Sequence, residues 1–281
     1  MSIATEITRI QQAKADIKTA IEAKGVTVPS SATIDTYDDY VSQISGGGGG
    51  GDTTTLAKLI DRSITSIDIP SGVTSIGESA FNGCSSLTSC TIPNAVTSIG
   101  DNVFYNCSSL TSIVIPDSVT SIGNNVFYYC RSITSIDIPS GVTSIGTAVF
   151  YGCTNLTTCK IGSGVTSIGN NVFYNCSSLT SIVIPDSVTS IGTYAFQNCR
   201  SLTTISIPTG VTSIGMSAFN GCTSLTSITV EATTPPTLSS ANAFNNTNNC
   251  PIYVPSESVD TYKAASRWSS LSSRIQAIPN S

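Results

Sequence analysis

The sequence NVFYNCSSLTSIVIPDSVTSIG occupies residues 102–123 and recurs without a change at residues 171–192. Its last four residues, Thr-Ser-Ile-Gly, occur seven times in the chain at intervals of 23 residues. The glycines that end them are Gly77, Gly100, Gly123, Gly146, Gly169, Gly192 and Gly215. The same step of 23 relates the phenylalanines from Phe81 to Phe219 and the cysteines from Cys84 to Cys222. A fixed period of this length predicts a solenoid, because one unit is too short to bury its apolar face alone.

The apolar residues of one repeat predict its core. These positions are Leu110, Ile113, Ile115, Val119, Ile122, Phe127 and Cys130, with Phe104 and Cys107 at the same positions one repeat earlier. The β-branched stretch 110–115 predicts a strand that ends at Pro116, because proline has no N–H for a ladder. Residues 119–122 predict a second short extended piece. We expect Gly123 to permit a turn with positive φ, and the residues up to Phe127 to form one helical or 3-10 turn.

A longer period lies over the first one. The sequence SITSIDIPSGVTSIG occurs at 63–77 and again at 132–146, which is a step of 69 residues. Three arginines, Arg62, Arg131 and Arg200, keep the same step. Three coils therefore form a block that has been copied, and such arrays lengthen without loss of fold because each unit contacts only its neighbours.

The pattern Leu-x-x-Ile-x-Ile resembles a leucine-rich repeat, and IPxxVTSIGxxAFxxC is similar to the BspA-type leucine-rich repeat family, over roughly residues 63–254. The chain departs from the pattern at Cys90 and Cys159, which replace the first strand isoleucine, and at Gly162, which replaces the proline. The resemblance implies a mainly β solenoid and a repeat cysteine that faces inward and bonds loop backbone. It also implies a concave strand face as ligand surface, and the family is common on bacterial surfaces and in gut-microbe genomes.

The ten cysteines favour buried thiols over disulfides. Side chains of a parallel ladder point in the same direction, whereas a disulfide needs its two Cβ atoms about 3.8 Å apart. Free cysteine is among the most buried residue types. The sequence has no CxxC pair, so metal and redox functions are not expected.

Composition excludes several classes of function. The chain of 281 residues has 12 basic and 17 acidic residues and no histidine. A charge-poor acidic chain argues against nucleic acid as a partner, and the absence of histidine removes the usual catalytic triads. The sequence contains no run of 18 apolar residues, so we expect no membrane insertion. The start MSIATEITRI lacks the features of a secretory signal. We therefore expect no enzyme and no cofactor.

The sequence predicts four parts. They are a helical docking or oligomerisation module at 1–45, a Gly-rich linker at 46–55, a solenoid of seven 23-residue coils plus an eighth strand at 56–230, and an irregular last coil with an α/β C-terminal cap at 231–281. In the cap, Ser256 is the expected N-cap of a helix that carries Val259, Tyr262 and Ala265 toward Trp268.

The N-terminal module allows two interpretations. One is a coiled coil, because a heptad pattern runs through Ile3, Ile7, Ile10, Ile17 and Ile21. Isoleucine at both seam positions favours a homotrimer or homotetramer over a dimer, but Lys14 interrupts the seam. The alternative is an amphipathic helix that packs on a second helix, with Lys14 reaching into solvent. The string KADIKTAIEAKGVTVPSSATIDTYDDYVSQI resembles a short module of phage tail-associated proteins, which implies docking to a virion or tail protein.

Two exposed rows are candidate ligand surfaces. Tyr105, Tyr128, Tyr151 and Tyr174 follow the core phenylalanine in four consecutive coils, with Tyr129 and Tyr194 nearby. Stacked tyrosines offer rigid amphipathic area, although they could also only shield the corner of the coil. The second row lies on the strand face and contains Asp68, Thr91, Val114, Asp137, Lys160, Val183, Ser206 and Thr229.

These features favour a non-enzymatic attachment protein whose solenoid contacts a bacterial surface protein or glycan. The N-terminal resemblance predicts a phage tail-associated or receptor-binding component, located in a virion that is assembled in the bacterial cytoplasm. The alternatives are a structural spacer or decoration protein of a virion, and a BspA-type adhesin of the bacterial cell surface. An enzyme would need a cleft with titratable groups, and the repeats offer almost none.

Overall fold

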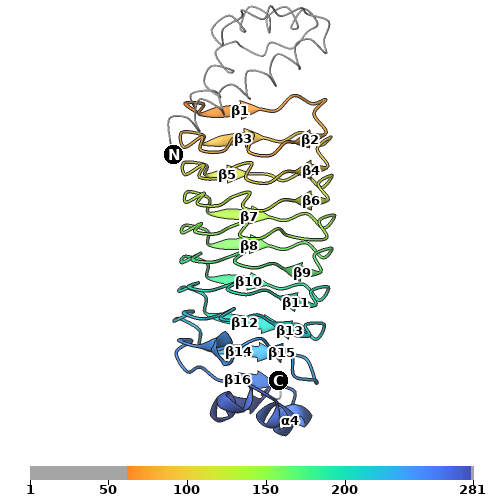
Figure 1. Cartoon of the computed structure of the whole chain (residues 1–281), viewed down its shortest axis with the longest axis vertical. Coiled ribbons are helices and arrows are strands. Elements are labelled where there is room, and N and C mark those ends of the chain that lie inside the picture. Colours follow the sequence, from red (N-terminus) through yellow and green to blue (C-terminus); the bar gives the residue numbers. More distant parts are fainter. Residues whose placement is uncertain (1–61, 280–281) are drawn as a thin grey trace, which may run out of the picture. The chain divides into compact units, whose positions relative to one another are not determined.

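The computed structural model describes residues 62–279, which form one unit of stacked coils (Figure 1). Within these residues, each coil contributes one turn of a mainly β solenoid, as the 23-residue period predicts. The predicted helical module at 1–45, the linker at 46–55 and residues 56–61 lie outside the described residues. None of the described helices is long and apolar enough to cross a membrane.

A first row of parallel strands runs along one side of the solenoid. Its strands are β1 (Ser66–Asp68), β3 (Ser89–Thr91), β5 (Ser112–Ile113), β7 (Ser135–Asp137), β8 (Thr158–Lys160), β10 (Ser181–Val183), β12 (Thr204–Ile207), β14 (Ser227–Val230), β16 (Ile252–Val254) and β17 (Ile275–Ala277). The register follows the repeat, so Ser66 pairs with Ser89. The row continues past Val230, because β16 pairs with β14 and β17 pairs with β16.

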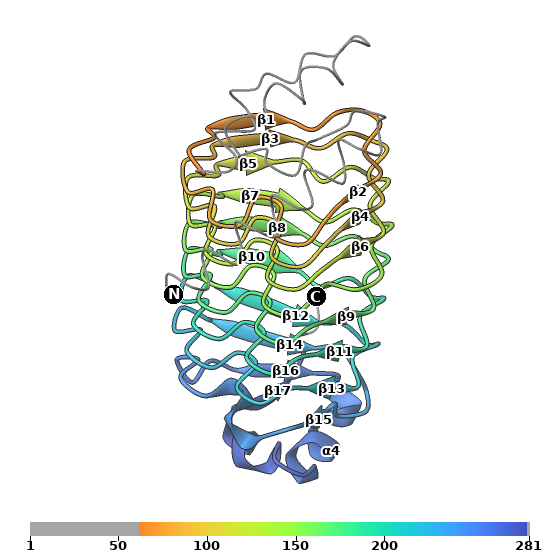
Figure 2. The ribbon, with the colours of Figure 1, turned by 45° about the horizontal axis from the view of Figure 1, so that its top comes forward.

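A second row of shorter strands runs beside the first (Figure 2). Its strands are β2 (Ser75–Ile76), β4 (Ser98–Ile99), β6 (Ser121–Ile122), β9 (Ser167–Ile168), β11 (Ser190–Ile191), β13 (Ser213–Ile214) and β15 (Thr237–Leu238). In each regular strand of this row, serine faces outward and isoleucine is buried, as alternation along a strand requires. The two predicted extended pieces of a repeat are confirmed, but the first is shorter than residues 110–115.

The segment between Gly123 and Cys130 corrects the prediction of a helical or 3-10 turn. Asn125 and Tyr129 have φ of 54° and 56°, so two left-handed residues interrupt any helix. The N–H groups of Asn125, Phe127 and Tyr129 donate to carbonyl oxygens of the next coil at 2.9, 2.9 and 2.8 Å. A helix would satisfy these donors within itself, whereas here they form a third ladder between coils.

The repeat glycine also has a different role from the predicted one. Gly123 is not among the residues with positive φ. A Cβ on Gly123 would lie 2.4 Å from Oδ1 of Asp101 and 2.7 Å from its backbone nitrogen. Glycine is required there because the preceding coil approaches too closely for any side chain.

The core confirms the predicted positions. Ile113 and Ile122 are 7 % and 4 % exposed, and Phe104, Phe127, Cys107 and Cys130 are fully buried. Eight phenylalanine rings from Phe81 to Phe244 stack with centroids 5.2–5.5 Å apart. Full burial of each such side chain contributes about 1.5–3 kcal/mol, so the ring column is a main source of stability.

The seven repeat cysteines form the expected column of buried thiols. All ten cysteines of the chain are buried and none forms a disulfide. The thiol of Cys107 donates to the carbonyl oxygen of Phe81 at 3.1 Å, and the thiol of Cys130 donates to that of Phe104 at 3.0 Å. Four further repeat cysteines make the same bond. These bonds confirm that the repeat cysteine faces inward and bonds loop backbone.

Short helices follow the last strand of the second row. They are η2 (Ala241–Phe244), η3 (Ser256–Ser258), α4 (Val259–Ala264) and η4 (Ser269–Arg274). The prediction that Ser256 caps a helix was wrong, because Ser256 begins η3, and α4 starts without a side-chain cap. Tyr262 does reach Trp268, with ring centroids 5.0 Å apart. Their polar atoms donate to the backbone of the last coil, to Ala232 and Pro236, both at 2.7 Å.

Candidate recognition surfaces

Four tyrosines that follow the core phenylalanines form a continuous stack, called here the Tyr column and consisting of Tyr105, Tyr128, Tyr151 and Tyr174. Successive ring centroids lie 4.7, 4.5 and 4.5 Å apart, with interplanar angles of 4–9°. The rings are half-buried. The structure therefore brings together the four tyrosines that the sequence singled out, because the spacing of the coils places equivalent rings in contact.

Tyr129 adds an edge to this column. Its ring meets those of Tyr128 and Tyr151 edge-on, at centroid distances of 4.6 and 5.6 Å. The guanidinium carbon of Arg131 lies 4.9 Å from the centroid of the Tyr129 ring, within the range of a cation–π contact. Tyr194 does not join the group. It occupies the position of Asn125 in its own coil, a different column of left-handed residues.

Stacking decides what the Tyr column can offer a ligand. Each inner ring uses both faces on its neighbours, so the accessible parts are ring edges and hydroxyl groups. Burial, and then the neighbouring phenols Tyr129, Tyr151 and Tyr105, raise the pKa of Tyr128 to about 12. Burial, and then the neighbouring phenols Tyr174 and Tyr129, raise the pKa of Tyr151. The hydroxyl groups of Tyr128 and Tyr151, in the middle of the column, therefore stay protonated at physiological pH.

The second candidate row lies on the outer face of the first strand row. Asp68 pairs in register with Thr91, and Lys160 lies between Asp137 and Val183. Val114 and Val183 are each 79 % exposed. The structure thus collects the predicted row on one surface, where two exposed valines flank an acid and a base in adjacent coils. The row continues through Tyr253 and Gln276, beyond the predicted residues.

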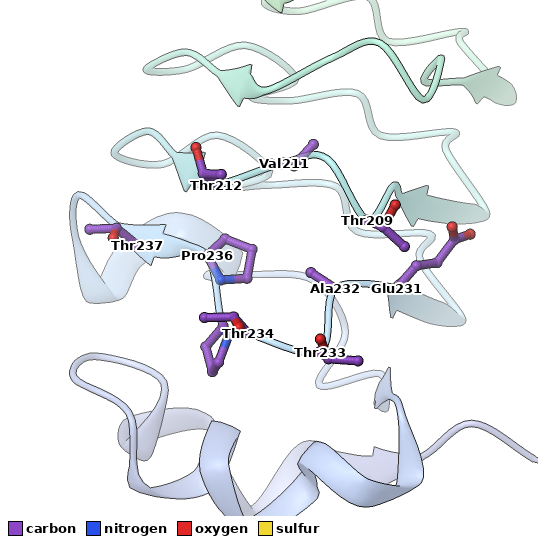
Figure 3. Close-up of a pocket in the computed structure, with 10 residues that line it drawn as sticks. Thr209, Val211, Thr212, Glu231, Ala232, Thr233, Thr234, Pro236 and Thr237 are labelled. Atoms are coloured by element: carbon purple, nitrogen blue, oxygen red, sulfur yellow. The ribbon is translucent and has the colours of Figure 1, made fainter.

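A pocket that the sequence did not predict lies beside the last regular coil (Figure 3). Its volume is about 320 Å³ and it is lined by Thr209, Val211, Thr212, Glu231, Ala232, Thr233, Thr234, Pro235, Pro236 and Thr237. The sequence signal that could have predicted this pocket is one extra residue in the loop between the two strands of the coil. Val230 and Thr237 are seven residues apart, while their partners Ile207 and Ser213 are six apart, so the loop bulges outward.

The pocket carries few charged groups. Glu231 is the one ionisable residue of its lining, and its carboxylate accepts a hydrogen bond from the hydroxyl of Ser206 at 2.5 Å. Among residues 62–279, no group of three or more His, Cys, Asp or Glu side chains could hold a metal ion.

The chain belongs to the BspA-type leucine-rich repeat family. The BspA type leucine rich repeat region matches in six copies, over residues 60–179 and 166–273. A leucine-rich repeat protein of T. pallidum is similar at 28 % identity over 57 % of this chain and 78 % of that chain, with a TM-score of 0.53. This likeness supports the repeat fold directly.

Further solved structures are similar to this chain. A leucine-rich repeat protein of Bacteroides ovatus is 25 % identical over 78 % of this chain and 85 % of that one, with a TM-score of 0.35. A leucine rich cell surface protein of Faecalibacterium prausnitzii is 24 % identical over 77 % and 80 %, with a TM-score of 0.41. No protein with a curated description matches the chain.

Proposed function

We propose that this protein is a non-enzymatic adhesin whose solenoid binds a protein or glycan on a bacterial surface. The observation that carries the proposal is the Tyr column, four half-buried rings stacked over consecutive coils at 4.5–4.7 Å. Rigid tyrosines provide contact area at little cost in side-chain entropy, as in antibody paratopes. The BspA-type family, whose members are typical of bacterial cell surfaces, supports the same class of function.

The second part of the proposal concerns where the protein is located, on a bacterial cell surface or on a virion. Family membership favours display on a bacterial cell surface. Location in a virion, with docking of residues 1–45 to a tail protein, depends on the N-terminal resemblance alone, and those residues lie outside the described region. Formation of a homotrimer by the N-terminal heptads belongs to that same interpretation.

We assign residues 231–281 the role of a C-terminal cap. Solenoids need a terminal element that covers the exposed end of the core. Trp268 supports this role, because its ring lies 5.6 Å from that of Phe244, the last phenylalanine of the stacked column. Trp268 and Tyr262 are both buried, and each donates a hydrogen bond to the last coil.

The experiment is adsorption of the labelled full-length chain to a panel of intact gut bacteria. Two variants are compared with it, Tyr105/Tyr128/Tyr151/Tyr174→Ala and, as the matched control for the strand face, Asp68/Asp137/Lys160→Ala. We expect strain-selective adsorption that falls at least about tenfold in the tyrosine variant, equivalent to about 1.4 kcal/mol, and persists in the control. Melting curves establish that both variants are folded.

The other outcomes separate the alternatives. Loss of adsorption only in the strand-face variant would move the ligand surface to the row of Asp137 and Lys160. Adsorption to no strain by any form would reject the adhesin and favour a structural spacer or decoration protein.

A further inference from the structure

Charge is segregated around the solenoid. The five residues that follow each core phenylalanine, for example 105–109 and 128–132, include no Asp or Glu in any of the seven coils. Two of these segments carry an arginine, Arg131 and Arg200. The protein as a whole is acidic, with a net charge of −5. The corner that bears the Tyr column thus carries two arginines and no acidic residue, although the chain as a whole is acidic.

A third arginine is held against the same corner. Gly83 and Gly152 have positive φ, and each leaves a recess for a large side chain of the preceding coil. Over Gly152 the recess holds Tyr129, and over Gly83 it holds Arg62, with Nη1 2.7 Å from the position of a Cβ. The side chain of Arg62 therefore fills the recess over Gly83 as the ring of Tyr129 fills the equivalent recess over Gly152, three coils later.

The three arginines are evenly spaced. Arg62, Arg131 and Arg200 are 69 residues apart, which is three coils. Adjacent strands are about 4.8 Å apart, so three coils advance about 14 Å along the solenoid. The Tyr column lies between the first and the last of these positions. We call the surface made by the Tyr column, Tyr129 and the three arginines the Tyr–Arg face.

We propose that the Tyr–Arg face binds an extended, acidic protein segment that lies along the solenoid axis. The inference rests on the proposed function and names the class of partner. In an extended strand, residues i and i+4 share one face and lie about 13–14 Å apart, which matches the step between the backbone positions of successive arginines. Carboxylates at that spacing would meet successive guanidinium groups, while intervening polar groups would meet the phenol hydroxyls.

The same geometry disfavours the other anionic polymers. Single-stranded nucleic acid binds by stacking its bases on aromatic faces, and the inner faces of the Tyr column are already covered by neighbouring rings. Polyanions with a charge on every unit would leave most of those charges unpaired against one cation per three coils. A segment with sparse carboxylates fits the observed density of charge.

The test is fluorescence anisotropy of the full-length chain with the labelled peptide TVETVTETVTETV, whose glutamates are four residues apart. Control peptides carry glutamine in place of glutamate, or the same composition with the three glutamates adjacent. The protein variant is Arg131→Gln with Arg200→Gln. Lys160→Gln is the matched control, because it removes a cation from the strand face.

We expect the four-spaced peptide to bind and to weaken at least about tenfold with glutamine or with the arginine variant, and less than about twofold with Lys160→Gln. Affinity should fall as salt rises from about 50 to 300 mM, because the contact is ionic. Absence of binding, equal binding of the glutamine or adjacent-glutamate peptide, or an equal loss with Lys160→Gln would overturn the proposal. Tighter binding of an oligo-dT or alginate probe at the same face would overturn it as well.

This assay contains no bacteria, so its failure is distinguishable from that of the adhesin proposal. Peptide binding without adsorption to cells would retain this surface and reject the adhesin. Adsorption that depends on the Tyr column without peptide binding would retain the adhesin and reject the acidic segment.

Discussion

The ring of Tyr129 occupies the space that a side chain on Gly152 would need: a Cβ there would lie 2.3 Å from Cδ1 of the tyrosine. A side chain also lies over a glycine of the next coil at Arg62 over Gly83 and at Asn198 over Gly221. The block of three coils is therefore a packing unit. In each block, one glycine with positive φ leaves space for a side chain of the preceding coil.

Gly152→Ala tests this packing. The substitution should lower the free energy of unfolding by at least about 1–2 kcal/mol, because alanine is strained at a φ of +70°. It should also displace Tyr129 from its edge contacts. Gly72→Ala is the control, since nothing lies within 4 Å of its Cβ position and its φ is not positive. Urea unfolding measures both, and equal stability of the two variants would contradict the assignment.

Ala148→Asn should stabilise the protein. Ala148 has a φ of 55°, in a column where Asn102, Asn125 and Asn171 hold the same conformation in other coils. Asparagine tolerates this region better than alanine, and Nδ2 of Asn125 already donates to Oδ1 of Asn102 at 3.1 Å. A gain of about 1 kcal/mol is expected in denaturant unfolding. The reverse change, Asn125→Ala, should lose a similar amount, and a loss in both variants would count against this account.

Stability should fall steeply at alkaline pH. Burial, and then the charge of Asp68, raise the pKa of Cys90 to about 12, and burial raises that of Cys159 with Asp137 as the second cause. Because a thiol of the unfolded chain has a pKa near 8.5, this stabilisation is complete below about pH 8.5 and is lost as pH rises toward the folded pKa. Each thiol costs about 1.4 kcal/mol per pH unit in that window.

Cys90→Ile with Cys159→Ile isolates this effect, since other coils carry isoleucine at the same position. By pH 10 the wild type should have lost about 4 kcal/mol more than the variant, relative to pH 7, because two ionising thiols are removed. Urea unfolding under reducing conditions at several pH values measures the difference. Parallel curves for the two proteins would show that these thiols do not ionise on unfolding.

The sequence was sufficient for the parts of the fold that depend on repetition. Phe104, Phe127, Cys107 and Cys130 recur at one spacing, so their common burial follows from the stacking of equal units. The role of Gly123 could not be read in this way. The need for glycine there comes from the approach of Asp101 in the preceding coil, which is a contact between coils and not a property of the turn.

The candidate surfaces were predicted as rows but not as geometry. The sequence predicted that Tyr105, Tyr128, Tyr151 and Tyr174 form one column. The structure shows in addition that their rings stack face to face, so the faces of the inner rings are covered by neighbouring rings. The position of Arg62 depends on the recess at Gly83, although the 69-residue step of Gly83, Gly152 and Gly221 was present in the sequence. The pocket depends on a single extra residue before Thr237.

The most direct test of the central claim is hydroxyl-radical footprinting of the full-length protein, free and bound to an adsorbing bacterial strain. Tyr105, Tyr128, Tyr151 and Tyr174 should be oxidised less in the bound state, because the ligand covers their edges. Tyr253, on the strand face, is the internal control and should be unchanged. Protection of Tyr253 with no change in the Tyr column would contradict the account and place the contact on the strand face.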